Sequence, residues 1–153
     1  MNGGDTIVLT LTEGTGASGR RPDFSGTWEY DPERSTLQID RPERATVTIE
    51  HKEPHLRFSR TLVVRGEPHS LTIDLTTDGR EHELHIDLGD IRARLDWEGA
   101  ALVFDTLLAR AGKTATNVVR YELSRDGLTL TARERFRSQD LDYDNVWVMA
   151  RRG

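Results

Sequence analysis

Arg60 is the side chain with the clearest potential for chemistry. It lies in the middle of an alternating segment, on the same face as Phe58 and Leu62. A guanidinium buried on an apolar face without a partner is very costly. Arg60 is therefore expected to anchor the carboxylate or enolate of a ligand. The alternatives are an internal ion pair, or a β-bulge that turns Arg60 outward.

Glu134 occupies a similar position, between Ala132 and Phe136 in another alternating segment. If it faces inward, it would pair with Arg60 or serve as a general acid or base. A bulge would instead turn it outward, toward the face that carries a stripe of basic residues. That stripe consists of Arg133, Arg135 and Arg137, with Arg120 on the preceding segment.

The histidines give weaker indications. His82 shares a face with Leu84, where it would contact a ligand, shuttle a proton, or be a neutral hydrogen-bonded core residue. His85 is three residues from His82, so on a strand the two face opposite ways and cannot form a simple two-histidine metal site. No metal or cofactor is predicted. The remaining histidines lie near predicted turns and are expected to be solvated: His51, His55 and His69.

Other inward-facing residues would line a cavity. Three mild polar groups would orient a ligand or bind a buried water, namely Thr106, Asn117 and Tyr121. Three aromatic residues are expected in the wall and core and as ligand contacts, namely Phe58, Phe104 and Trp97.

The segments that position these side chains have the period of half-buried strands. Phe24–Tyr30 alternates, and about ten such segments follow one another with short turns and no helical period. Consecutive hairpins favour an all-β, antiparallel up-and-down sheet, and closure into a barrel would remove its exposed edges. The alternative is a two-sheet sandwich, which more often has longer crossovers.

One hairpin is predicted in detail. Asp78-Gly79 is a strong signal for a two-residue turn. The turn would match the apolar faces of the two flanking strands. The predicted pairs are Leu75 with His82, Ile73 with Leu84, and Leu71 with Ile86.

Two segments stand apart from the strands. Residues 31–44 form a long connection in which Asp31-Pro32 predicts a short helical turn, and its apolar Leu37 and Ile39 would rest over one end of the core as a lid. Residues 1–23 are expected as a flexible arm ahead of a barrel domain at 24–153. Within the arm, Thr6–Thr12 has strand composition and would be an extra edge strand, a partner-pairing strand or a loose segment.

Composition narrows the function classes. The chain has 153 residues, no cysteine, a net charge of −5 and 35% hydrophobic residues, which suits one domain without disulfides. The basic stripe lacks interleaved aromatics and the chain is acidic, so no nucleic-acid partner is expected. No apolar run has membrane-spanning length. The N-terminus lacks signal-peptide regions, so a cytoplasmic location is expected, or a periplasmic or secreted one if a leader has been removed.

Gly26-Thr27-Trp28, together with Trp97-Glu98-Gly99 ahead of Leu102-Val103, resembles the calycin group of lipocalins and fatty-acid-binding proteins. The resemblance implies that the Gly-x-Trp strand closes the barrel base and that an arginine near the C-terminus, here Arg151, covers the tryptophan. It implies a barrel for a small ligand and names no ligand.

Over roughly residues 24–150 the chain is similar to a bacterial lipocalin-like family. The matching stretches are 24–28, 51–54, 76–81, 97–99 and 123–130. Unlike fatty-acid-binding proteins, this chain has no helical pair between its first two strands, and it lacks the signal peptide that such bacterial relatives usually carry.

These observations lead to three functional hypotheses. The first is a monomeric or homodimeric binding module that holds a small hydrophobic ligand with Arg60 at its anionic or carbonyl end. The second is a cofactor-free cyclase or isomerase in which Arg60, Glu134 or Tyr121 acts on a hydrophobic metabolite. The third is an interaction protein with a filled barrel. Small inward residues favour a void, namely Gly26, Ala45, Ala93, Ala115 and Ala132.

Overall fold

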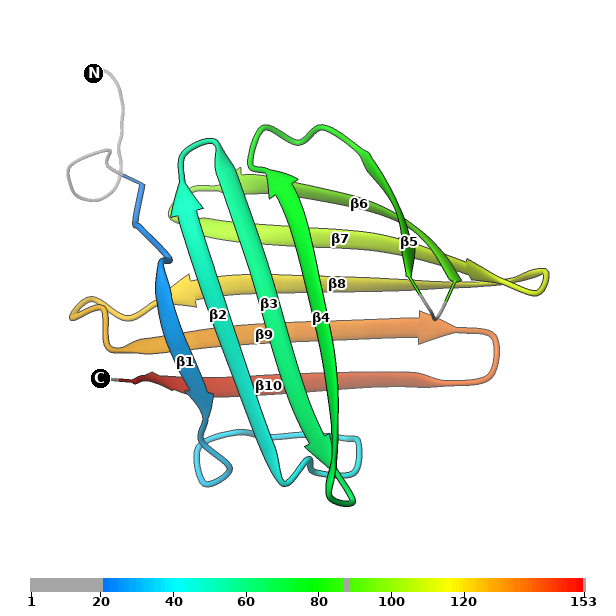
Figure 1. The fold of residues 1–153 in the computed structure, drawn as a ribbon, viewed down its shortest axis with the longest axis horizontal. Helices are drawn as coiled ribbons and strands as arrows, with labels where there is room; N and C mark the ends of the chain where they lie inside the picture. Colours follow the sequence, from blue (N-terminus) through cyan, green and yellow to red (C-terminus); the bar gives the residue numbers. More distant parts are fainter. Residues whose placement is uncertain (1–20, 87–88, 153) are drawn as a thin grey trace.

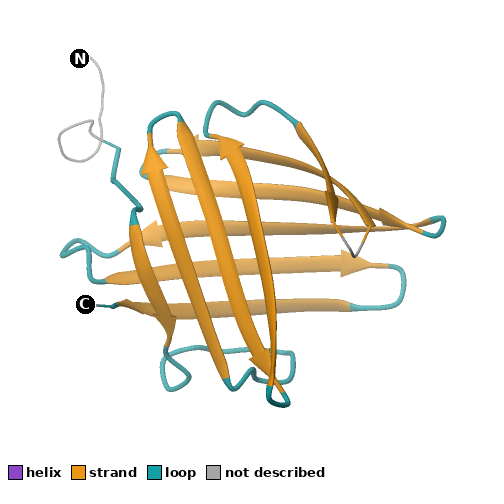
Figure 2. Ribbon diagram, in the orientation of Figure 1, coloured by secondary structure: helices purple, strands orange, loops and turns teal. Residues whose placement is uncertain are grey.

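The computed structural model describes residues 21–86 and 89–152, and every regular element within them is a β-strand (Figure 1; Figure 2). The strands are β1 Gly26–Tyr30, β2 Arg44–Lys52, β3 His55–Val64, β4 Glu67–Thr76, β5 His82–Ile86, β6 Gly89–Glu98, β7 Ala101–Arg110, β8 Lys113–Leu123, β9 Thr129–Ser138 and β10 Asp142–Arg151. The predicted arm at Thr6–Thr12 lies outside the described residues.

The strands form one antiparallel sheet in the order β4-β3-β2-β1-β10-β9-β8-β7-β6-β5. Figure 1 shows β1–β4 as one layer that crosses over β6–β10 in the other. The sheet thus wraps into a nearly closed barrel, as the alternation and the short turns predicted. Inward residues of both layers meet in one core that includes Trp28, Leu95 and Leu130.

The predicted hairpin at Asp78-Gly79 is wrong. β5 pairs with β6, and β4 and β5 are the two end strands of the sheet. Gly79 N–H donates to the carbonyl of Leu95 at 3.0 Å, and Asp78 forms a bridge with Asp96. The chain is therefore held by β6 as soon as β4 ends, and this long-range pairing displaces the local turn that the dipeptide favours.

One end of the barrel is closed around Trp28, and we call it the closed end. Trp28 and Phe24 have no exposed surface, and the indole N–H of Trp28 donates to the carbonyl of Phe24 at 3.2 Å. The guanidinium carbon of Arg151 lies 4.3 Å from the centroid of the Trp28 ring, which is a cation–π contact. This is the arrangement that the calycin resemblance implied for Arg151.

Residues 31–43 connect β1 to β2 and run along the edge of β10 that β1 leaves free. Backbone hydrogen bonds join Thr36 to Val146 in both directions at 2.8 Å. Asp31 accepts the N–H of Glu33 and starts a turn where a short helical turn was predicted. The predicted lid residues Leu37 and Ile39 are half-buried.

The basic stripe lies on the outside of β8 and β9, where carboxylates accompany it. Arg133 and Arg120 contact Glu122 at 3.8 Å and 3.7 Å, and Arg137 contacts Asp144 at 2.8 Å. Three of the four arginines in the stripe, Arg120, Arg133 and Arg137, are thus partly neutralised by a neighbour. This pairing is typical of a solvated barrel exterior.

Candidate ligand-binding site

The barrel encloses a cavity of about 270 Å³. Its walls come from β2 to β10 and are mostly apolar, with residues such as Val47, Ile73 and Leu108. Three aromatic residues form the floor toward the closed end. The ring of Phe58 lies 6.4 Å from that of Phe104 and 6.0 Å from that of Tyr121. All three also line the small void below, so they separate the cavity from the packed core.

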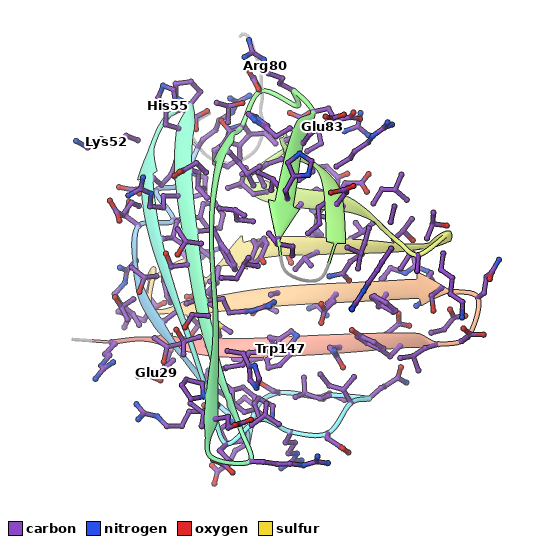
Figure 3. All side chains as sticks on the ribbon, turned by 45° about the vertical axis from the view of Figure 1, so that its right-hand side comes forward. Glu29, Lys52, His55, Arg80, Glu83 and Trp147 are labelled. Atoms are coloured by element: carbon purple, nitrogen blue, oxygen red, sulfur yellow. The ribbon has the colours of Figure 1, made fainter. Side chains whose placement is uncertain are left out.

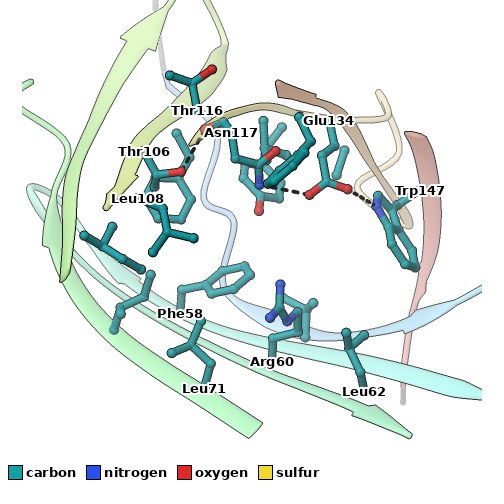
Figure 4. Close-up of a pocket in the computed structure, with 18 of the residues that line it drawn as sticks. Phe58, Arg60, Leu62, Leu71, Thr106, Leu108, Thr116, Asn117, Glu134 and Trp147 are labelled. Carbon is teal, nitrogen blue, oxygen red and sulfur yellow. Dashed lines mark hydrogen bonds between the residues drawn. The ribbon is translucent and has the colours of Figure 1, made fainter. Parts of the chain in front are cut away.

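Arg60 lies on the cavity wall, pointing inward from β3 (Figure 4). Its strand is regular here, with Val47 of β2 and Leu71 of β4 as its paired neighbours. The alternative of a bulge that turns Arg60 outward is therefore wrong. Its Nε is buried and has no hydrogen-bond partner. The Nε–H of Arg60 is thus an unused hydrogen-bond donor on the cavity wall.

Glu134 also lines the cavity, from β9, and its carboxylate is held by three N–H donors. The indole of Trp147 and the amide of Asn145 both donate to Oε1 at 2.9 Å. The amide of Asn117 donates to Oε2 at 2.9 Å. All three donors belong to the strands paired with β9, Asn117 to β8 and the other two to β10, so the sheet register itself fixes the carboxylate.

The alternative of an internal ion pair between Arg60 and Glu134 is not formed in the described part of the barrel. Arg60 Nε has no partner, and the hydrogen bonds of Glu134 go to Asn117, Asn145 and Trp147. Figure 4 shows the two side chains reaching into the lumen from opposite walls. Both charges are therefore available to a bound molecule.

Two phenols lie within the field of these charges. Burial raises the pKa of Tyr121 well above its usual range, Glu134 raises it further, and Arg60 lowers it. Burial and Glu134 likewise raise the pKa of Tyr143, with Arg60 again opposing. Both phenols are protonated at neutral pH, so each is a potential hydrogen-bond donor.

Thr106 and Asn117 are brought together by the pairing of β7 with β8. The hydroxyl of Thr106 donates to the carbonyl of Asn117 at 2.9 Å, so its proton is already used. The side-chain Oδ1 of Asn117 is buried and has no partner. Of these two predicted cavity residues, Asn117 has the unused group.

Two predicted site residues lie outside the cavity. His82 is paired with Ala93, and its Nε2 lies 3.0 Å from the hydroxyl of Thr76. Leu84 and Ile86 of the same strand line the cavity, but His82, at the start of β5, does not. Trp97 packs at the closed end, with its ring centroid 6.0 Å from that of Phe24.

His51 is buried, contrary to the prediction that it would be solvated, whereas His55 and His69 are exposed as predicted. Phe24 N–H donates to its Nδ1 at 3.2 Å, so the proton of the neutral ring is on Nε2, which lies 2.8 Å from Glu53 Oε1. Segment 23–25 folds over the end of β2 and covers the ring. Figure 3 shows neighbouring Lys52 and His55 extending outward from this end.

Sequence reasoning missed three residues of the site, all on β10. Tyr143, Asn145 and Trp147 share one face of the strand, and the first and last line the cavity. These residues are two positions apart, which is the spacing that places side chains on one face of a strand. The strand predicted from the sequence covers only the apolar run at 146–149, so it does not include Tyr143 and Asn145.

Among the described residues, no group of three or more His, Asp or Glu side chains is arranged to hold a metal ion. Within 21–86 and 89–152, no helix is long and apolar enough to cross a membrane. The side chains that line the cavity supply both hydrogen-bond donors and hydrogen-bond acceptors. Arg60 and the phenols donate, and Glu134 and Asn117 accept.

No protein-family model and no curated protein matches this chain. Several solved structures are similar. Secretory abundant heat soluble protein 4 from Ramazzottius varieornatus has a TM-score of 0.60 at 15% identity, covering 85% of this chain and 95% of that one. The wild-type fluorescent protein UnaG has a TM-score of 0.55 at 17% identity, and the match covers 84% of this chain and 97% of that one. Zebrafish ileal bile acid-binding protein in complex with cholic acid has a TM-score of 0.52 at 15% identity, and the match covers 84% of this chain and 98% of that one.

The fold is calycin-like. The order of the ten strands and these neighbours confirm the resemblance at the level of the fold. At such low identity the likeness concerns architecture alone. The similarity to a bacterial lipocalin-like family stays a prediction.

Proposed function

We propose that this chain binds a small, largely apolar ligand in the barrel lumen, with Arg60 anchoring its anionic or carbonyl end. The observation that carries the proposal is the buried Nε of Arg60, which has no partner on an otherwise mostly apolar wall. A buried guanidinium donor without an acceptor is unfavourable. A ligand oxygen removes that cost and is held by a charge-assisted hydrogen bond.

The size of the cavity limits the ligand. Its volume of about 270 Å³ lies just below the range of about 300–1,000 Å³ that is usual for sites of drug-sized molecules. The ligand is therefore compact, or it leaves part of its length at the mouth. The binding of cholic acid by the zebrafish protein of similar fold supports a small apolar molecule in the lumen.

The cyclase or isomerase hypothesis uses the same groups. Tyr121 and Arg60 would donate to a carbonyl, and Glu134 would accept a proton. The binding proposal requires only that Arg60 and the apolar walls hold the molecule. We therefore take binding as the primary function, and turnover stays a prediction for this cavity.

The test uses a matched pair of fluorescent probes. Anilinonaphthalene sulfonate is anionic, and N-phenylnaphthylamine is the neutral molecule that lacks the sulfonate. Titrating the wild type and Arg60→Met should show at least about tenfold weaker binding of the anionic probe to the variant. The neutral probe should bind both proteins with similar affinity.

Arg57→Met is the matched control. Arg57 is on the outer face of the same strand, where its Nε bonds Asp74 at 2.8 Å, so its loss should leave both probes unaffected. Equal affinity of the wild type and Arg60→Met for both probes would remove Arg60 from the site.

A further inference from the structure

Asn117 carries a hydrogen-bond acceptor that no described residue satisfies. Its Nδ2 donates to Glu134 Oε2 at 2.9 Å, which fixes the amide, because a flipped amide would set two oxygens against each other. Its Oδ1 is buried and has no partner. Leaving such a buried acceptor unpaired is unfavourable. A ligand that brings an N–H to this oxygen would recover that cost.

Glu134 presents a second acceptor beside it. Its Oε1 accepts two N–H donors, from Asn145 and Trp147, whereas its Oε2 accepts one, from Asn117. Each carboxylate oxygen has two lone-pair sites, so Oε2 has room for another donor. Asn117 Oδ1 and Glu134 Oε2 thus form a pair of unfilled acceptors on the wall of β8 and β9 (Figure 4).

Arg60 faces this acceptor pair from the opposite wall (Figure 4). A plain fatty acid would satisfy the guanidinium and leave Asn117 Oδ1 without a donor. A molecule with an acceptor at one point and an N–H donor at another complements both walls.

We infer that the lumen selects a dipolar ligand, in which an apolar body carries a carboxylate or carbonyl for Arg60 and an N–H donor for Asn117 and Glu134. N-acyl amino acids and related amides are the chemical class that combines these features. This inference rests on the proposed function and adds to it the second polar contact. It predicts discrimination between molecules of the same charge and nearly the same size.

The test compares N-decanoylglycine with N-decanoylsarcosine by calorimetric titration of the full chain. Both carry a carboxylate and the same acyl chain, and they differ in that a methyl group replaces the amide hydrogen. The wild type should bind the glycine compound about tenfold more tightly, since one hydrogen bond to a buried acceptor is lost with the methyl group. This comparison needs no variant.

Two variants then locate the preference. Asn117→Leu should bring the ratio of the two dissociation constants close to one, whereas Arg60→Met should weaken both compounds and keep the ratio. If the wild type binds both compounds equally while Arg60→Met still weakens them, the donor site is wrong and the Arg60 anchor stands. If neither compound binds, or Arg60→Met changes nothing, the proposed function fails and this inference fails with it.

Discussion

Asn145 joins Glu134 to the segment that follows β1. Its Nδ2 donates to Glu134 Oε1 at 2.9 Å, and its Oδ1 accepts the backbone N–H of Gln38 at 2.8 Å. The side chain is almost completely buried. A single amide therefore holds both the cavity carboxylate and the connection at 31–43.

Replacing Asn145 should loosen that connection. Asn145→Leu leaves the Gln38 N–H without its acceptor and removes one donor from Glu134, so the free energy of unfolding should fall by about 1–3 kcal/mol. Hydrogen exchange at the Gln38 amide should become faster. Asp144→Asn, on the exposed face of the same strand, is the control and should leave that amide protected. Unchanged exchange in Asn145→Leu would show that the segment is held by other contacts.

Trp28 should be the most costly residue to truncate at the closed end. It has no exposed surface and is covered by Arg151. Trp28→Ala should lower the free energy of unfolding by about 3–5 kcal/mol, measured by chemical denaturation. A loss below about 1 kcal/mol, which is typical of surface changes, would contradict the central place of this residue.

Glu53 should make the closed end sensitive to acid. Burial raises the pKa of its carboxyl, but hydrogen bonds from His51, Trp97 and Thr77 outweigh burial and lower that pKa. A carboxyl with a lowered pKa stabilises the fold above its unfolded pKa, and this contribution is lost as the pH falls through the folded pKa.

The wild type should therefore exceed Glu53→Gln in stability near neutral pH by about 1 kcal/mol, since solvent screens this partly exposed carboxylate. The difference should shrink as the pH falls below the usual pKa of a glutamate, about 4.3, and vanish below the lowered pKa of the folded state. Denaturation of both proteins across this pH range measures it. A difference that does not depend on pH would show that the charge of Glu53 has no role.

Arg60→Met should not destabilise the empty protein. Arg60 Nε has no partner, and Glu134 is held by other donors, so the fold loses no ion pair. The variant should be as stable as the wild type or more stable by about 1 kcal/mol. Adding Glu134→Gln to Arg60→Met should then give no further gain in stability. A loss of more than about 2 kcal/mol in Arg60→Met would indicate a partner for the guanidinium within the protein.

Local patterns were sufficient to predict the barrel and the inward position of Arg60 and Glu134. Alternation fixes which side chains share a face, and short turns impose antiparallel neighbours. The position of Asn117 and Tyr121 on the wall follows from the same rule. These properties depend on residues close in sequence, which is why the sequence alone reveals them.

Contacts between distant segments were beyond such patterns. Asp78-Gly79 has hairpin chemistry, yet Gly79 bonds Leu95 on another strand. His51 lies next to a turn, yet Phe24 covers it from 27 positions away. Asn145 acquires its role only because Gln38 and Glu134 meet on either side of it. In each case the deciding partner is remote in sequence.

The claim that the lumen is the binding site is tested most directly by filling it. Leu71 lines the cavity beside Arg60, on the paired strand β4, whereas the adjacent Thr72 points outward and bonds Ser59 at 3.1 Å. Leu71→Trp should occupy the lumen, and Thr72→Trp adds the same side chain outside. In calorimetric titrations with anilinonaphthalene sulfonate, the wild type and Thr72→Trp should bind one molecule each, and Leu71→Trp should bind at least about tenfold more weakly. Equal binding by all three proteins, or binding by none, would contradict a ligand site in the barrel.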